Sequence, residues 1–91
     1  MLSLSSTVAA LPDQLSTTLG QDAVILNMTT GMYYGLDPVG ARIWALVQQP
    51  RTVAEIRDIL LEEFEVGAAQ LELDLMALLA DLEKRALIEA R

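Results

Sequence analysis

The feature that most restricts the fold is a change of sequence pattern at Asp37. Before it, short apolar segments are separated by turn residues, and residues 22–28 (DAVILNM) form a run long enough for a buried strand. A turn-like Thr-Thr-Gly follows, so Met32–Leu36 reads as the returning arm of a hairpin. After Asp37 the apolar residues recur at helical spacing. The sequence therefore predicts strands over about residues 1–36 and helices over about residues 37–90.

Two helix starts can be read from capping residues, and a third from a glycine break. Asp37 is placed as an N-cap with Pro38 at the first helical position, where a missing N–H costs nothing. Thr52 and Glu55 have the spacing of a capping box, in which each side chain satisfies a free backbone N–H of the other residue. After a break at a glycine, the third helix is expected from about Ala68 to about Ile88.

This order of elements predicts an α+β fold. A small N-terminal antiparallel sheet would pack on a cluster of three helices, and two of the helices joined by a short glycine-containing turn resemble a helix-turn-helix. Together they would form a winged helix-turn-helix arrangement. Ninety-one residues suffice for one modest core, so we expect a single domain over residues 1–91.

The composition excludes several classes of function. The chain has no cysteine and no histidine, which removes thiolate chemistry, the commonest metal ligand and the usual general base at neutral pH. Six basic residues face thirteen acidic ones, and the net charge of -7 repels phosphate backbones and anionic membranes. No apolar run approaches the length of a membrane span, and the first residues lack the basic region of a signal peptide. We therefore expect a cytoplasmic protein without a metal or cofactor.

No catalytic constellation stands out. Glu62, Glu63 and Glu65 are close together, but they are typical of a solvated helix end, since nothing nearby in the sequence would perturb their pKa values. We therefore do not expect an enzyme. A winged-helix DNA-binding regulator remains an alternative, in which the third helix would enter the major groove. Against it, Glu72 and Asp74 place negative charge at the start of that helix.

The third helix carries more apolar surface than a small domain needs. Leu71, Leu75, Leu78 and Leu82 form one stripe at helical spacing, and a second stripe consists of Leu73, Met76, Ala80 and Leu87. Together the stripes cover more than half of the circumference, whereas a surface helix needs about 100° of apolar face. One stripe can pack on the other helices. The second is either covered by the sheet or left facing a groove, and the pattern leaves both possibilities open.

The strand before the first helix can supply the other side of such a groove. If Met32–Leu36 is an edge strand, its unpaired N–H and C=O groups can bind an extended peptide as an added strand. Tyr33 and Tyr34 would point to opposite faces, and Gly35 would let a second backbone come close. Trp44 is predicted to anchor the first helix in the core.

An ordered set of segments resembles the PqqD-like proteins, also called recognition elements for ribosomally made and modified peptides. The set consists of Val24–Asn27 (VILN), residues 40–44 (GARIW), residues 52–56 (TVAEI) and the stretch from Asp74 to Ile88. The resemblance covers about residues 24–88. Two positions depart from it, because Ala86 stands where glycine is common and Asp37 where asparagine is common.

The resemblance implies a function as well as the winged helix-turn-helix fold. A chain of this length is similar to the small proteins of lasso-peptide biosynthesis, which grip the leader of a precursor peptide antiparallel to the last strand, beside the third helix. They then deliver it to a leader peptidase of the transglutaminase-like cysteine protease type and to a macrocyclase. The carried-over contacts are Met32, Tyr33, Tyr34, Gly35, Leu36, Leu71, Asp74, Leu75 and Leu78. The alternative is a peptide chaperone for a radical-enzyme pathway such as PQQ biosynthesis.

Overall fold

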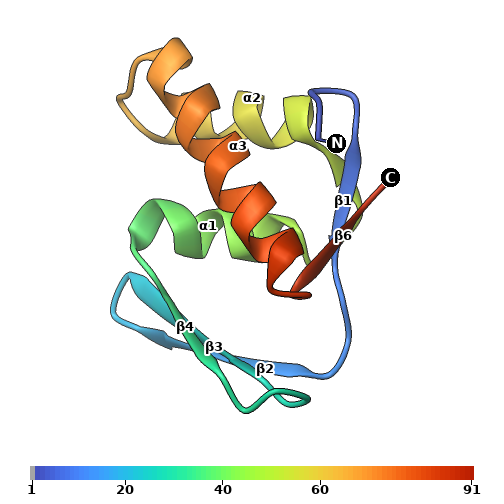
Figure 1. The fold of residues 1–91 in the computed structure, drawn as a ribbon. Coiled ribbons are helices and arrows are strands. Elements are labelled where there is room, and N and C mark those ends of the chain that lie inside the picture. The colour runs from blue at the N-terminus through green and yellow to red at the C-terminus, as the bar shows by residue number, and fades with distance from the viewer. Residues whose placement is uncertain (1) are drawn as a thin grey trace.

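The computed structural model describes residues 2–91, so position 1 of the expected domain lies outside it. Within these residues six strands and three helices follow one another, and the strands form two antiparallel sheets (Figure 1). The expected α+β fold is confirmed. In chain order the elements are β1 (Thr7–Ala10), β2 (Gln14–Leu19), β3 (Asp22–Asn27), β4 (Tyr33–Leu36), α1 (Pro38–Leu46), β5 (Arg51–Thr52), α2 (Val53–Glu63), α3 (Ala68–Lys84) and β6 (Ile88–Ala90).

The larger sheet has the order β2-β3-β4, and it contains the expected hairpin. Asn27 shapes the turn between β3 and β4, because its side-chain oxygen accepts hydrogen bonds from the N–H groups of Thr29 and Thr30 at 2.9 and 3.2 Å. Gly31 has a φ of 75° there, a conformation that costs glycine little. The hairpin returns the chain as β4, which ends where α1 begins.

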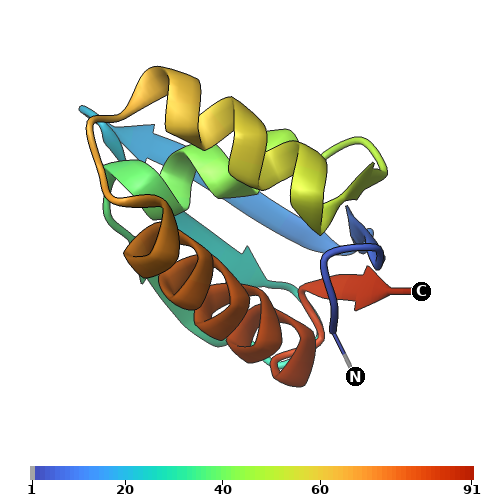
Figure 2. The same ribbon diagram turned by 90° about the horizontal axis from the view of Figure 1, so that it is seen from above.

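Capping residues set the helix starts as predicted. The Asp37 side chain accepts a hydrogen bond from the Gly40 N–H at 2.7 Å, and Pro38 occupies the first helical turn. Thr52 and Glu55 form the complete capping box at the start of α2. In Figures 1 and 2 the three helices lie above the β2-β3-β4 sheet, and α1 lies closest to it.

The smaller sheet, of order β5-β1-β6, was not expected from the sequence. β1 is its central strand, and Val8 pairs with Arg51 on one side and Ala90 on the other. The prediction that α3 extends to about Ile88 is wrong, because the helix ends at Lys84 and Ile88 already belongs to β6. A strand of three residues has too little sequence for periodicity to reveal it.

α3 ends in a Schellman motif centred on Ala86. The Leu87 N–H donates to the Leu82 carbonyl at 2.9 Å, and the Ala86 N–H donates to the Glu83 carbonyl at 3.0 Å. This geometry requires a left-handed residue after the cap, and Ala86 has a φ of 59°. Buried Leu87 then directs the chain into β6. Ala86, which stands where the similar proteins commonly have glycine, therefore occupies a position whose backbone favours glycine.

Replacing Ala86 by glycine is expected to stabilise the protein. The left-handed conformation costs an L-residue roughly 1–2 kcal/mol, and the extra entropy of glycine in the unfolded chain offsets about half of that gain. Urea denaturation should show a free energy of unfolding higher by about 0.5–1 kcal/mol. Ala80→Gly, at an exposed position inside the same helix, should instead lower it by about 1 kcal/mol. Equal effects of both substitutions would contradict the left-handed conformation assigned to Ala86.

The core lies between the helices and the larger sheet, and Val8 and Ile88 of the smaller sheet also belong to it. α3 contributes a buried stripe, and Trp44 is buried among apolar neighbours, as predicted. The two apolar stripes predicted for α3 are only partly confirmed. Leu78 lies beside the core at a half-buried position, Leu79 takes its place inside, and Leu73 is 68% exposed. The buried positions of α3 are Leu71, Leu75, Leu79 and Leu82.

Candidate functional site

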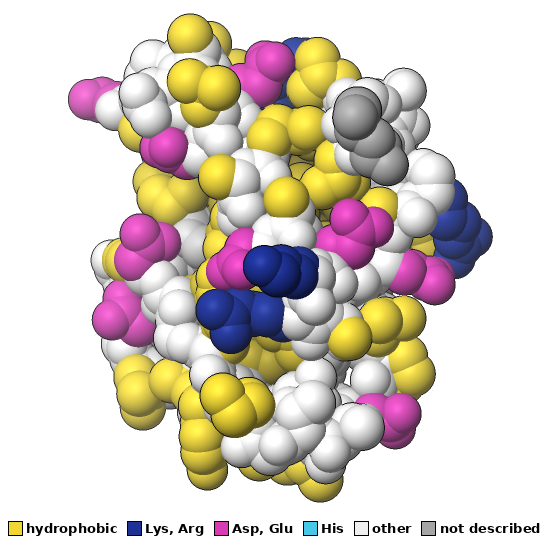
Figure 3. Space-filling model, viewed as in Figure 1, with side chains coloured by type: hydrophobic (Ala, Val, Ile, Leu, Met, Phe, Trp, Pro, Cys, Tyr) yellow, Lys and Arg dark blue, Asp and Glu magenta, His cyan; other side chains and the backbone are white. Residues whose placement is uncertain are grey.

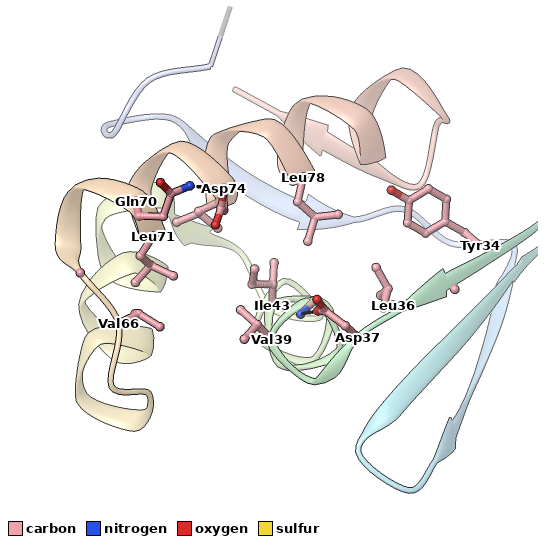
Figure 4. A pocket seen from close by; sticks show the side chains of 14 residues that line it. Tyr34, Leu36, Asp37, Val39, Ile43, Val66, Gln70, Leu71, Asp74 and Leu78 are labelled. Carbon is pink, nitrogen blue, oxygen red and sulfur yellow. Dashed lines mark hydrogen bonds between the residues drawn. The ribbon is translucent and has the colours of Figure 1, made fainter.

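A groove of about 660 Å³ separates β4 and the start of α1 from the first half of α3 (Figure 4). Figure 4 shows side chains from all three elements converging on this space, with Leu78 on one side and Tyr34 and Leu36 on the other. The lining is mainly apolar. It consists of Tyr34, Gly35, Leu36, Asp37, Val39, Gly40, Ile43, Val66, Gly67, Gln70, Leu71, Asp74, Leu75 and Leu78.

The strand side of the groove is an edge with unused hydrogen-bonding groups. Among the described residues β4 pairs with β3 alone, and the Asn27 N–H donates to the Met32 carbonyl at 2.9 Å. Because bonded and non-bonded pairs alternate in antiparallel strands, Tyr34 and Leu36 also bond to β3. The N–H and C=O groups of Tyr33 and Gly35 therefore point away from β3. A Cβ atom added to Gly35 would meet nothing within 4 Å, so this position faces open space.

The structure brings most of the sequence-predicted site residues to this groove, in two different roles. Leu36, Leu71 and Leu75 are buried and form its floor as part of the core. Leu78 and Tyr34 are half-buried and remain accessible to a ligand. Gly35 and Asp74 complete the predicted set at this groove, whereas Met32 and Tyr33 line an adjacent hollow instead.

Part of the lining was missed by the sequence reasoning. Val39 and Ile43 come from α1, and they form the base of the groove. Asp37 was recognised as an N-cap but also lies at the rim. Gln70 donates to an Asp74 carboxylate oxygen at 2.9 Å, so this side chain supports one of the two rim carboxylates. The one sequence signal that could have revealed the α1 residues is that α1 begins directly after the edge strand.

Three side chains connect β4 to the end of α3. The Tyr34 hydroxyl donates to the Asp81 carboxylate, and the Arg85 Nε also donates to Asp81 at 3.2 Å. The Arg85 guanidinium carbon lies 4.7 Å from the centre of the Tyr34 ring. Burial, and then the bond to Asp81, raises the pKa of the Tyr34 hydroxyl, while the same bond lowers the pKa of Asp81. This Tyr34–Asp81–Arg85 cluster joins β4 to the end of α3.

The cluster predicts a pH-dependent effect of Tyr34→Phe. Because the folded chain lowers the pKa of Asp81, the ionised carboxylate stabilises the fold above the ordinary value of 3.8, and this contribution is lost as the pH falls through the lowered pKa. Tyr34→Phe should therefore reduce the free energy of unfolding more at neutral pH than in acid below 3.8. Urea denaturation at both pH values measures the difference. A loss that is the same at both would contradict the bond to an ionised Asp81.

Two carboxylates, those of Asp37 and Asp74, line the groove. Among residues 2–91, no three His, Cys, Asp or Glu side chains are grouped so as to hold a metal ion. Glu63, one of the clustered glutamates, forms an ion pair with Arg42 at 2.7 Å that lowers its pKa. In the described part of the chain no helix is long and apolar enough to span a bilayer. An apolar groove beside an open strand edge instead suits an extended peptide.

Known proteins share this architecture. A family model described as coenzyme PQQ synthesis protein D (PqqD) matches residues 22–88. Among curated protein sequences, none matches the chain. The solved structure of TbiB1 in complex with the TbiA(beta) leader peptide is 33% identical, with a TM-score of 0.80 over 89% of this chain and 94% of TbiB1.

A second solved structure supports the fold alone. Lasso peptide synthetase B1 complexed with the leader peptide is 22% identical, with a TM-score of 0.77 over 90% of this chain and 96% of that protein. The family match covers well over half of the chain, and it includes all of β4, α1 and the groove-forming helix α3. The protein therefore belongs to the PqqD family.

Proposed function

We propose that this protein is a non-catalytic module that recognises the leader of a ribosomally made precursor peptide in lasso-peptide maturation. The observation that carries the proposal is the open edge of β4 beside the apolar groove. The leader would add to Tyr33 and Gly35 as a further antiparallel strand and place alternate side chains in the groove. TbiB1, which is similar over most of both chains, is a protein seen with a leader peptide.

The groove offers enough interaction energy for useful binding. A Kd of about 1 μM corresponds to roughly -8 kcal/mol. The N–H and C=O groups of Tyr33 and Gly35 contribute about 1 kcal/mol net each, which the ordering of a flexible peptide largely offsets. Two or three apolar leader side chains buried against Leu78, Val39 and Ile43 would add about 1.5–3 kcal/mol each. Apolar anchors therefore determine the affinity, and backbone pairing determines the register.

The proposed contacts keep the predicted set, with roles assigned by accessibility. Tyr33 and Gly35 bond the leader backbone, and Tyr34, Leu78 and Asp74 contact its side chains. Leu36, Leu71 and Leu75 form the floor of the groove, and Met32 lies beyond its end. The bound leader would then be presented in the cytoplasm to a leader peptidase of the transglutaminase-like type and to a macrocyclase.

Titration with the synthetic leader encoded beside the gene tests this function. We expect a Kd of about 1 μM or tighter, and NMR should show the largest shifts in β4 and in the first half of α3. The purified chain alone should leave the precursor intact, with cleavage appearing only when the peptidase is added. A leader that does not bind, or cleavage by the isolated chain, would contradict the proposal.

A second candidate function follows from the family description, which is that of a coenzyme PQQ synthesis protein. In that role the same groove would carry a peptide to a radical enzyme. Titrating the protein with both types of precursor separates the two functions. Stronger binding of a PQQ-type precursor would favour the second.

A further inference from the structure

A second hollow of about 280 Å³ continues the groove at the other end of β4. Tyr34 lines both spaces and forms the boundary between them. The second hollow lies between the start of β4 and the turn that ends α3. Its lining consists of Asn27, Thr30, Met32, Tyr33, Tyr34, Lys84, Arg85, Ala86 and Leu87.

The two spaces carry charges of opposite sign. The main groove has the carboxylates of Asp37 and Asp74 and no basic residue, whereas the second hollow has Lys84 and Arg85 and no acidic lining residue. Figure 3 shows basic side chains grouped in the middle of this face, above the apolar side chains of the larger sheet. In a chain with a net charge of -7, a local pair of cations is a distinctive feature.

The two cations differ in how firmly they are held. Arg85 is fixed by Asp81 and by the Tyr34 ring, so its position is set before any ligand arrives. Within residues 2–91, no carboxylate lies within 4 Å of the Lys84 ammonium group. Lys84 is exposed and can reach an anionic group in the hollow. One cation is therefore preorganised and the other is free to pair.

The register of β4 determines which peptide side chains reach each space. A residue opposite Leu36 or Tyr34 has its side chain on the α3 side, over the main groove, and a residue opposite Met32 reaches the second hollow. β4 runs from the second hollow towards the main groove. An antiparallel peptide therefore meets the main groove with its N-terminal part and the second hollow with its C-terminal part.

We propose that Lys84 and Arg85 form a subsite for an acidic side chain of the bound peptide. This side chain lies two residues C-terminal to the apolar one opposite Tyr34 and four residues C-terminal to the apolar one opposite Leu36. Basic residues are favoured further towards the N-terminus, near Asp74. The opposite charges at the two ends therefore select one direction of the peptide. The subsite rests on the proposed leader recognition and adds a sequence rule to it.

A selection experiment tests this rule without a known leader. The immobilised full chain is used to select from a phage-displayed library of random linear peptides. We expect enriched sequences with two apolar residues separated by one residue, followed two positions later by Asp or Glu. Enriched peptides without a charge preference there would overturn the subsite and leave peptide binding intact. Enrichment of the reverse charge order would overturn the assigned direction, and no enrichment at all would overturn both the subsite and the proposed function.

A charge swap tests the residue itself. The Kd of an enriched peptide, measured by fluorescence anisotropy, should rise about three- to tenfold with Lys84→Glu. Replacing the acidic residue of the peptide by lysine should restore binding to Lys84→Glu. Arg91→Glu makes the same change in net charge outside both spaces and should leave the Kd unchanged. Equal losses of affinity in both variants, or no rescue by the lysine peptide, would show that the overall charge and not the subsite determines the Kd.

Discussion

Replacing Leu78 by glutamate is expected to weaken leader binding about 10- to 100-fold while the chain stays folded. Leu78 is the half-buried leucine that α3 presents to the groove, so an apolar leader side chain should bury against it (Figure 4). Losing one such anchor costs about 1.5–3 kcal/mol, and each 1.4 kcal/mol corresponds to about a tenfold change in Kd. The measurement is a calorimetric titration of the variant with the synthetic leader.

Leu73→Glu is the matched control. Leu73 lies on the same helix but is 68% exposed and outside both spaces, so the same substitution should leave the Kd unchanged. Leu75 is unsuitable although it lines the groove, because it is 0% exposed and a polar residue there would unfold the core. Unchanged affinity in a folded Leu78→Glu protein would exclude this side of the groove from the site.

Replacing Gly35 by proline is expected to weaken leader binding by about tenfold or more without disrupting the larger sheet. The Gly35 N–H points away from β3, so proline removes no bond of the ladder, and proline is tolerated at such edge positions. It does remove a donor to the leader, and its ring obstructs the approach of a second backbone. Circular dichroism checks the fold, and titration measures the affinity.

Two further measurements separate the loss of backbone hydrogen bonds to the leader from steric obstruction at position 35. Gly35→Ala should bind the leader normally, because the added Cβ atom meets open space. On the peptide side, N-methylation should weaken binding at the two residues opposite Gly35 and Tyr33 and be tolerated at the residue between them. Uniform tolerance together with a helical bound leader would show that the edge of β4 is not used.

The local elements could be predicted because their signals are local. Asp37, Thr52 and Glu55 satisfy free N–H groups within one helical turn, and Pro38 has no N–H that needs a partner. Neighbouring residues alone therefore define these starts. The hairpin that ends in β4 follows from a short apolar run, a glycine turn and a second short run. The family resemblance rested on the same local segments, which is why it held over residues 22–88.

The site residues that the sequence did not reveal are the ones whose role depends on how the helices pack against β4. Val39 and Ile43 have the same spacing in a core and in a groove, and only the position of α1 beside β4 and α3 shows that they line a groove. In the same way, Leu78 and Leu79 are adjacent leucines, and the packing of α3 buries one and leaves the other half-buried.

The sequence by itself determined the order of strands and helices, the caps, the absence of histidine and cysteine chemistry, and the family. Tertiary structure decided the rest. β5 and β6 exist because β1 offers them partners from distant parts of the chain, and pairing energy from distant residues leaves no local periodicity. The opposite charges at the two ends of β4 arise because α3 runs back along the strand, which brings Asp74 to one end and Lys84 and Arg85 to the other.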